Sequence, residues 1–342
     1  MNLKANVPLG PYTTFHIGGP ARFLIEANTE KDIEDAVAFS RERRLPLYPL
    51  GAGSNVLVPD DGVEGVVLHM VLGGVAFEND GTDTLLVGGA GVLWDTVVDA
   101  ACKRSIFGIE NLAGVPGTLG GAAVQNIGAY GAEFVNVFEY ADTIHRETGE
   151  RRRITRDEAA LAYRTSIFKK QRDYIITRIA LRFKPDTVPN ISYPDLKQRQ
   201  ARGEALATPA DIARTVRSIR AEKFPPSAEG GTAGSFFKNP IVPRAFADAL
   251  AKRFPGLPLF PQGNTDAKVS LAWLLDHALS LKGYAAGTVR LYEKQPLVIV
   301  AREGATAAQV DAHARTVAEQ VFETIGITVE REVETFGITY FS

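Results

Sequence analysis

The sequence is poor in the residues that form covalent or metal cross-links. Cys102 is its only cysteine, so no disulfide can form within the chain. Cys102 lies among apolar residues in the segment DTVVDAACKRS, and we interpret it as a small buried side chain. The five histidines are scattered without the spacing of metal ligands, so the sequence predicts no metal site.

Long apolar runs and an excess of positive charge are absent as well. No apolar run approaches the roughly 18 residues of a membrane-spanning helix, and the N-terminal MNLKANVPLG has no apolar signal core. A net charge of −2 does not resemble the strongly basic character that is typical of nucleic-acid-binding proteins. We therefore expect a cytoplasmic protein with neither a membrane nor a nucleic acid as partner, and we expect a monomer.

What is present is the composition of a globular protein with a core of its own. The 342 residues are 45% hydrophobic and 23% charged, and this length suits two or three domains. Apolar periodicity predicts helices over residues 30–44, 95–105, 156–164, 209–223, 243–254, 268–283 and 306–326. It predicts strands over 45–51, 63–71, 84–94, 174–183, 295–300 and 327–337, a hairpin over 137–155, and a polar connection over 185–200. This mixture predicts an α+β protein.

Two glycine tracts could bind a ligand through the backbone. The first, Gly51–Asn55, follows a predicted strand. The dinucleotide-binding fingerprint would need a third glycine and a helix, but Val56 and a further strand follow, so that fingerprint is excluded. A Walker A motif is excluded too, because neither tract contains Gly-Lys-Ser/Thr. The remaining alternatives are a turn whose amides hold a phosphate and a plain hairpin turn.

The second tract consists of two glycine clusters, Gly114–Gly121 and Asn126–Gly131. Small residues between glycines predict either close contact with a flat or extended ligand or close packing of backbone segments. Two such tracts in a chain without a nucleic-acid signature favour a large cofactor that contains a pyrophosphate.

Seven sequence blocks resemble one enzyme family in order and spacing over nearly the whole chain. The blocks are YTTFHIGGPA, LGAGSNVLV, GIENLAGVPGTLGGAAVQNIGAYGAE, AYRTSIFK, GTAGSFFKNP, KVSLAWLLD and the closing EREV. The chain thereby resembles the UDP-N-acetylenolpyruvoylglucosamine reductase family, in its longer form because of the segment SYPDL. It departs from the family pattern at Arg331, where proline is usual, and at Pro194, where glycine is common.

The resemblance implies a fold and a cofactor. The fold is the two-lobed FAD-binding fold of the vanillyl-alcohol oxidase superfamily, with a C-terminal α+β substrate-binding domain. Lobe 1 would comprise residues 1–68 with 320–342, lobe 2 residues 69–218, and the substrate-binding domain residues 219–319. Some members of that superfamily attach flavin covalently through a histidine. The loop Gly51–Asn55 has no histidine, so we expect non-covalent FAD. Its expected contacts are Gly51, Ala52, Gly53, Ser54, Asn55, Gly114, Pro116, Gly117, Gly120, Gly121, Asn126, Gly128 and Ala129.

The resemblance also implies a reaction in two halves. NADPH reduces FAD, and the reduced flavin passes a hydride to the enolpyruvyl ether of a UDP-sugar, which gives UDP-N-acetylmuramate for peptidoglycan synthesis. Negative charge then develops on the adjacent carbon and its carboxylate. The chemistry therefore needs an acid and groups that stabilise this charge.

Three residues take the catalytic roles by resemblance. Ser235 would donate the proton, Arg164 would bind the carboxylate through its two-pronged guanidinium, and Glu332 would be a second electrostatic or acid partner with a raised pKa. Without the resemblance, Ser235 is only a serine after a glycine in a turn, and Arg164 is a surface charge. Alternation along a strand places Glu332 with two other glutamates on one face, so periodicity does not select it. The substrate contacts implied are Tyr193, Lys223, Asn239 and Gln295.

Two other functions remain open from the residues. A flavin-dependent oxidase of hydroxy acids or alcohols would use oxygen and would not need Arg164, Ser235 and Glu332 together. A non-catalytic flavin or nucleotide sensor would bind without turnover. A serine hydrolase is disfavoured because Ser235 lies outside a Gly-x-Ser-x-Gly motif. We interpret Trp273 as a core residue of its domain and not as a stacking surface.

Overall fold

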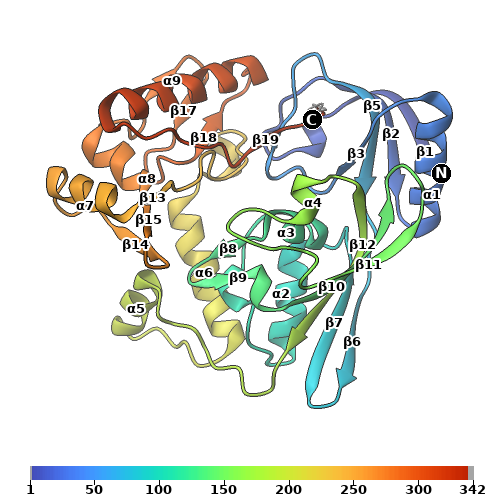
Figure 1. Ribbon diagram of the computed structural model, residues 1–342, viewed down its shortest axis with the longest axis horizontal. Coiled ribbons are helices and arrows are strands. Elements are labelled where there is room, and N and C mark those ends of the chain that lie inside the picture. The colour runs from blue at the N-terminus through green and yellow to red at the C-terminus, as the bar shows by residue number, and fades with distance from the viewer. Residues whose placement is uncertain (1, 338–342) are drawn as a thin grey trace. The chain divides into compact units, whose positions relative to one another are not determined.

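The computed structural model describes residues 2–337 (Figure 1). The chain forms two compact units. Unit 1 comprises the chain up to Pro8, Pro20–Gly53 and Val63–Ala221, and unit 2 comprises Leu9–Gly19, Ser54–Gly62 and the chain from Glu222 onward. The predicted division into two lobes and a third domain stays a prediction, and its residues 1 and 338–342 lie outside the described chain.

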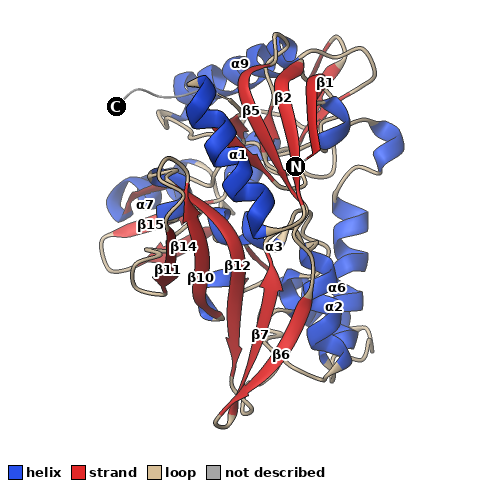
Figure 2. Ribbon diagram, turned by 90° about the vertical axis from the view of Figure 1, so that its right-hand side faces the viewer, coloured by secondary structure: helices blue, strands red, loops and turns tan. Residues whose placement is uncertain are grey.

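The first sheet of unit 1 has one antiparallel and two parallel pairings. β5 (Val63–Met70) lies between two parallel neighbours and is buried along most of its length, as expected of such a strand. Figure 2 shows α1 (Glu30–Arg43) lying across this sheet. Thr29 starts α1 with a capping box, which satisfies amides that have no partner inside the helix. In spatial order the strands are β1 (Asn2–Pro8), β2 (Pro20–Ala27), β5 (Val63–Met70) and β3 (Leu47–Leu50).

The second sheet of unit 1 is antiparallel throughout. It contains the predicted hairpin as β10 (Phe138–His145) and β11 (Arg151–Thr155), with Asp142 opposite Arg153. In spatial order the strands are β11 (Arg151–Thr155), β10 (Phe138–His145), β12 (Tyr174–Phe183), β7 (Asp83–Gly89) and β6 (Val75–Asp80). The other elements of unit 1 are α2 (Trp94–Lys103), η2 (Glu110–Leu112), α3 (Leu119–Gln125), β8 (Gly128–Ala129), β9 (Ala132–Glu133), η3 (Phe134–Asn136), α4 (Ile167–Lys170), α5 (Pro194–Ala201) and α6 (Pro209–Lys223).

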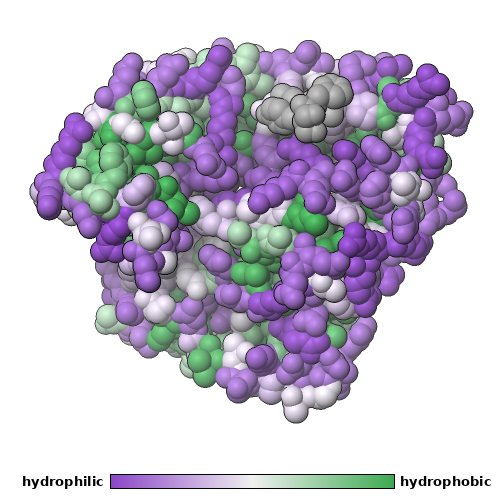
Figure 3. Space-filling model, viewed as in Figure 1, coloured by the Kyte–Doolittle hydropathy of each residue, from purple (hydrophilic) through white to green (hydrophobic). Residues whose placement is uncertain are grey.

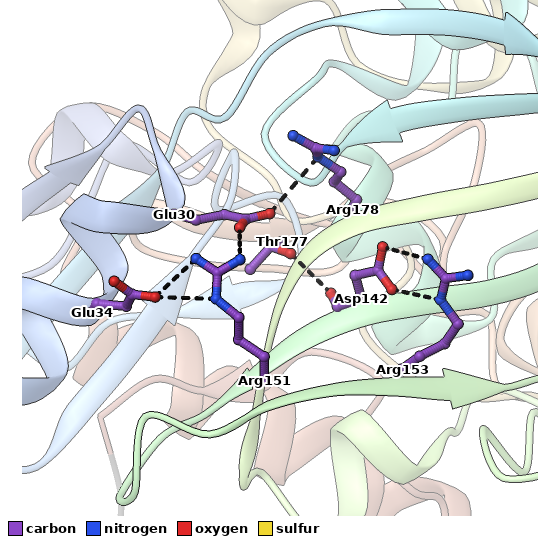
Figure 4. Close-up of polar contacts among 7 residues, drawn as sticks. All are labelled: Glu30, Glu34, Asp142, Arg151, Arg153, Thr177 and Arg178. Carbon is purple, nitrogen blue, oxygen red and sulfur yellow. Dashed lines mark hydrogen bonds and ion pairs between the residues drawn. The ribbon is translucent and has the colours of Figure 1, made fainter.

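A cluster of charged side chains joins the two sheets of unit 1 through α1 (Figure 4). The Arg151 guanidinium donates to Glu34 Oε1 from Nη2 at 2.8 Å and also pairs with Glu30. Arg178 of β12 approaches the same Glu30 carboxylate at 3.8 Å. Two carboxylates of one helix thus face arginines from two strands of the second sheet, although ion pairs so open to solvent add little to folding stability.

Unit 2 is built from small sheets and the long helix α9 around a separate core. Phe15 and Leu57, which come from the two inserted N-terminal segments, are buried in that core with Phe236. The sheets are β13 (Ile241–Pro243), β15 (Asp266–Val269) and β14 (Leu259–Gln262); β16 (Ala285–Ala286), β17 (Val289–Leu291) and β18 (Ile299–Ala301); and the parallel pair β4 (Val56–Leu57) and β19 (Glu334–Thr335). The helices are η1 (Gly10–Tyr12), η4 (Ser227–Glu229), α7 (Arg244–Arg253), α8 (Leu271–Trp273), the π-helix η5 (Leu274–Ala278) and α9 (Ala307–Ile325).

The helix expected over residues 156–164 is wrong, because the chain makes only one turn there. The amide of Ala159 donates to the Thr155 carbonyl at 2.9 Å, as at the start of a helix. The turn then stops at Ala160, whose φ is +45°. The amide of Ile167 donates to the Ala159 carbonyl at 2.9 Å, so a bond to a later segment takes the place of the next helical bond.

The polar connection expected over residues 185–200 contains a helix that the sequence analysis missed. α5 begins at Pro194, and proline suits the first helical position because the amide there has no partner inside the helix. The predicted helix 268–283 is also only partly right. Its first two residues, Lys268 and Val269, complete β15, Leu271–Ala278 forms α8 and η5, and residues 279–283 are not helical.

The strand expected over residues 327–337 is regular only in β19. Arg331 makes a single bridge with Phe237, and the chain then pairs with β4. Because the segment changes its partner halfway, no continuous ladder can form along it. Alternation along one strand was therefore the wrong basis for judging which side chains share a face.

The surface is mostly hydrophilic on the face shown in Figure 3, with apolar side chains in separate places. In residues 2–337 no helix is long and apolar enough to cross a membrane. Single exposed apolar side chains such as Val188 and Phe322 are normal on globular proteins.

His313 of α9 predicts a dependence of stability on pH. The ring is 3% exposed, stacks on Tyr284 with centroids 5.2 Å apart, and has no hydrogen-bond partner for either nitrogen among the described residues. Burial lowers the pKa of His313, since a charged imidazolium would lose its hydration. The stability that the neutral ring provides is complete above the unfolded pKa of about 6.5 and is lost as the pH falls toward the folded pKa.

We therefore expect His313→Phe to flatten the pH dependence of unfolding. The free energy of unfolding of the wild type should fall relative to this variant by up to about 1.4 kcal/mol per pH unit below pH ~6.5. Urea titrations at several pH values measure the difference. Parallel pH curves for the two proteins would show that His313 is protonated in the folded state as easily as in the unfolded one.

Candidate functional site

The two glycine tracts meet within unit 1 at Thr118. Gly51 follows β3 and packs so closely that a β-carbon there would lie 2.7 Å from the Thr118 hydroxyl oxygen. Thr118 begins α3, and its hydroxyl accepts from the amide of Gly121 at 3.2 Å. Gly53 has φ +60°, in the left-handed region that favours glycine. Only the absence of a side chain at position 51 lets these segments approach each other.

Charged side chains fix the start of the second tract. The Gly114 amide donates to Asp95 Oδ1 at 2.7 Å, and the Gly114 carbonyl accepts from Arg220 Nε at 2.9 Å. Arg220 also hydrogen-bonds Tyr130, which is in the second glycine cluster. Burial raises the pKa of Tyr130 to about 12 and lowers the pKa of Arg220. At neutral pH the contact is therefore one between a neutral phenol and a guanidinium.

Arg164 is hydrogen-bonded to the second cluster of the second glycine tract. Its Nη2 donates to the Gly128 carbonyl at 2.8 Å, and a β-carbon at position 128 would lie 3.2 Å from its Nη1. The backbone around it is held by Asn126, whose side-chain amide donates to the Ala162 carbonyl at 2.8 Å. Arg164 itself has φ +55°, a conformation that costs a residue with a β-carbon and recurs at functional sites.

Tyr193 lies against the same tract, immediately before α5. Its ring and that of Tyr130 meet edge to face, with centroids 5.2 Å apart and planes at 70°. Tyr193 remains 37% exposed, so part of its ring is open to solvent. Within unit 1 the predicted substrate-binding tyrosine thus adjoins the predicted cofactor-binding tract.

Ser235 lies on the central segment of a backbone ribbon in unit 2. Ser235 forms a bridge with Val298, and the next amide, that of Phe236, donates to the Leu297 carbonyl at 2.7 Å. On the other side the Phe236 carbonyl accepts from the amide of Glu332 at 2.8 Å. We call segments 297–298, 235–238 and 330–333 the Ser235 ribbon. It places the backbones of Ser235 and Glu332 on neighbouring segments, although the two residues are far apart in sequence.

Asn55 holds the outer segment of this ribbon, residues 330–333, on the side away from Ser235. Its side-chain amide donates to the Glu332 carbonyl at 3.0 Å, and its own carbonyl accepts from the amide of Glu334 at 3.1 Å. β4 then continues this contact by pairing with β19. A residue predicted to contact the cofactor therefore also holds the backbone of a predicted catalytic residue.

The other predicted substrate contacts, Lys223, Asn239 and Gln295, lie in unit 2 and are half-buried. Lys223 is the last residue of α6. Asn239 accepts from the amide of Leu271 through Oδ1 at 3.0 Å. The side-chain oxygen of Gln295 is buried and has no hydrogen-bond partner among the described residues, which is an expensive state for a polar atom.

Sequence reasoning missed Thr118, Tyr130 and Arg220. Thr118 could have been identified from the sequence as a helix cap directly after a glycine. Tyr130, which lies among glycines, and Arg220, one of several arginines on a helix, carry no comparable signal. Cys102 is half-buried, and burial raises the pKa of its thiol to about 11. The thiol is therefore protonated at neutral pH, which agrees with a packing role.

Comparison with known families defines the class. A model described as an FAD binding domain matches residues 21–155. A model described as the C-terminal domain of UDP-N-acetylenolpyruvoylglucosamine reductase matches residues 225–336. The chain is thus a flavoprotein of the oxidoreductase class, with an FAD-binding domain followed by a second α+β domain, and the predicted fold class is confirmed.

Whole-length relatives define the family. UDP-N-acetylenolpyruvoylglucosamine reductase of Pseudomonas aeruginosa (strain PAO1) is 39% identical over 97% of this chain and 98% of its own length. The enzyme of the same name from Shewanella sp. (strain MR-4) is 36% identical over 97% and 96%. The crystal structure of the Thermus caldophilus reductase covers 98% of both chains with a TM-score of 0.67 and 25% identity. The chain belongs to the UDP-N-acetylenolpyruvoylglucosamine reductase family.

Proposed function

We propose that this chain uses NADPH and non-covalent FAD to reduce UDP-N-acetylglucosamine enolpyruvate to UDP-N-acetylmuramate, in cytoplasmic peptidoglycan precursor synthesis. The Ser235 ribbon is the observation that carries the proposal. It holds a hydroxyl-bearing residue and a carboxyl-bearing residue on neighbouring segments, as a proton donor and a charge-stabilising acid require.

The residues of unit 1 fit FAD. Gly51 is half-buried beside Thr118, and Ala52, which follows it in the chain, is half-buried as well. Gly117 and Gly121, on either side of Thr118 in the sequence, are also half-buried. Backbone without side chains can approach a pyrophosphate closely, and adjacent amides can donate to its oxygens. Gly128 and Ala129, which are also half-buried, would give the flat part of the cofactor a surface without bulky side chains.

Bound FAD would supply the hydride acceptor and donor that link NADPH to the enolpyruvyl double bond. The chain's own residues bind the substrate and provide the proton. Arg164 would bind the enolpyruvyl carboxylate with the guanidinium nitrogens that are not donating to Gly128. Ser235 Oγ would give its proton to the carbon next to that carboxylate, and the carboxyl group of Glu332 would stabilise the charge there.

The nucleotide diphosphate part of the UDP-sugar would be bound by Lys223, Tyr193, Asn239 and Gln295. An ammonium group is a natural counter-charge for a diphosphate, so Lys223 takes that role. The side-chain oxygen of Gln295 would gain a hydroxyl or amide donor from the sugar. A small number of well-placed polar groups is enough to fix the orientation of a ligand in its site.

A two-step anaerobic titration tests the proposal. The yellow holoenzyme should be bleached by NADPH and should regain its colour when the enolpyruvyl UDP-sugar is added without oxygen. UDP-N-acetylglucosamine, which lacks the enolpyruvyl group, is the matched control and should leave the flavin reduced. Recolouring by oxygen but not by the enolpyruvyl sugar would support the oxidase instead, and a flavin that NADPH does not bleach would support a binding protein.

A further inference from the structure

Glu332 lies at an irregular point of the Ser235 ribbon. The amides of Glu332 and Val333 both face the Phe236 carbonyl, at 2.8 Å and 3.5 Å. Two residues on one segment therefore oppose one residue on the other, which is the arrangement of a β-bulge. A bulge redirects side chains and interrupts the ladder, so the direction of the Glu332 side chain depends on contacts other than the ladder.

Arg331 supplies such contacts directly before Glu332. Its guanidinium forms an ion pair with Asp311 of α9, and its central carbon lies 5.6 Å from the centroid of the Phe236 ring. Phe236 follows Ser235 in the chain and is the residue opposite the bulge. One side chain thus connects the segment that carries Glu332, the segment that carries Ser235 and a helix.

α9, which carries Asp311, is held in place at its N-terminus and along its buried face. Thr306 starts α9 with a capping box, and the carboxylate of Asp60 accepts from the amides of Ala307 at 2.7 Å and Ala308 at 2.9 Å. Several residues on the inner face of α9 are fully buried. Asp311 lies one turn after this start, so a bond to its carboxylate fixes a segment relative to the core of unit 2.

We propose that Arg331 is a positioning residue that sets the direction of Glu332 relative to Ser235. It does so by fastening its segment to Asp311 and to the ring of Phe236. The ribbon bonds beside it are made by the Glu330 carbonyl and the Glu332 amide, so Arg331→Ala leaves their donors and acceptors in place and removes only the side-chain contacts that hold the segment. The inference rests on the proposed function, because it assigns the reaction to Ser235 and Glu332.

The contacts of Arg331 suit positioning better than stability. The Arg331 and Asp311 side chains are each about one-third exposed, at 32% and 35%, and an ion pair so open to solvent adds little to folding stability. Placement is more demanding, since a misplacement of about 1 Å can cost about 100-fold in rate. A variant at this position should therefore fold and still react slowly.

The experiment compares Arg331→Ala, Asp311→Asn and Arg315→Ala in the FAD-loaded full chain. Arg315 is the matched control, because its Nε pairs with the same Asp311 carboxylate at 3.1 Å and, within residues 2–337, its guanidinium does not lie over the Phe236 ring. For Arg331→Ala we expect reoxidation by saturating enolpyruvyl sugar to slow about 10- to 100-fold, with flavin content and bleaching by NADPH unchanged. Asp311→Asn should slow it in the same direction, and Arg315→Ala should stay within about twofold of the wild type.

Hydrogen exchange provides a readout that does not require turnover. The amides of Glu332 and Lys238 bond across the ribbon, and they should exchange about tenfold faster in Arg331→Ala but not in Arg315→Ala. Wild-type reoxidation in Arg331→Ala or Asp311→Asn, or equal slowing of both half-reactions, would overturn the positioning role. If wild-type flavin is not reoxidised by the sugar, the proposed function fails, and the exchange data still decide whether Arg331 orders the ribbon.

Discussion

Ser235→Ala is expected to give a yellow protein that NADPH bleaches normally but that the enolpyruvyl sugar barely recolours. Loss of a positioned proton donor costs about 10²- to 10⁴-fold in rate. The FAD site should not change, because the predicted cofactor contacts of unit 1 do not include Ser235. Flavin reoxidation followed by stopped-flow absorbance under anaerobic conditions measures the loss.

A serine in the segment between α6 and β13, which also contains Ser235, provides the control for this prediction. Ser227 is exposed in η4, so Ser227→Ala removes a hydroxyl of the same kind without touching the Ser235 ribbon. We expect it to reoxidise at the wild-type rate. Near-normal reoxidation in Ser235→Ala would remove Ser235 from the mechanism and would leave Glu332 as the candidate proton donor.

Arg164→Ala should have the second largest effect, and mainly on substrate binding. A hydrogen-bonded ion pair with the enolpyruvyl carboxylate contributes about 1.5–3 kcal/mol, so the half-saturating concentration of the sugar should rise about 10- to 150-fold. Arg164→Lys should recover only part of this, because an ammonium group cannot donate to Gly128 and grip a carboxylate with the same planar fork. Steady-state kinetics at varied sugar concentration measure the effect.

The backbone conformation at position 164 does not affect the comparison of the alanine and lysine variants with the wild type. Its φ of +55° disfavours any residue with a β-carbon, so alanine and lysine carry the same backbone cost as arginine. Arg202→Ala removes an exposed arginine of the same unit and should leave the kinetics unchanged. If Arg164→Ala binds the sugar as tightly as the wild type does, the carboxylate is held by another group.

Elements with local start and stop signals could be predicted closely from the sequence. α6 begins at Pro209, as predicted, and the Thr208 hydroxyl before it accepts from the Asp211 amide at 3.1 Å. α9 runs between the cap Thr306 and Gly326, whose φ is +79°. Capping depends on residues within one turn of the helix end, so the residue types alone indicate where these helices begin and end.

Segments whose partners are far away in sequence could not be predicted in this way. The helix expected at 156–164 was stopped by the bond from Ile167, and the strand expected at 327–337 was divided between two partners. Arg220 shows the same limit at the site. Nothing in a helical arginine indicates that it will bind Gly114 and Tyr130, because those contacts form only when the helix packs against the glycine tract.

The sequence by itself determined the family, the candidate residues and the glycine tracts, because these depend on residue identity and order. Only the tertiary structure decided that Gly51 meets Thr118, that Ser235 and Glu332 share a ribbon, and that Arg331 reaches Asp311. The reason is physical. Residue types limit which bonds a segment can make, but packing selects among the partners, and it alone brings residues from distant parts of the chain within bonding distance.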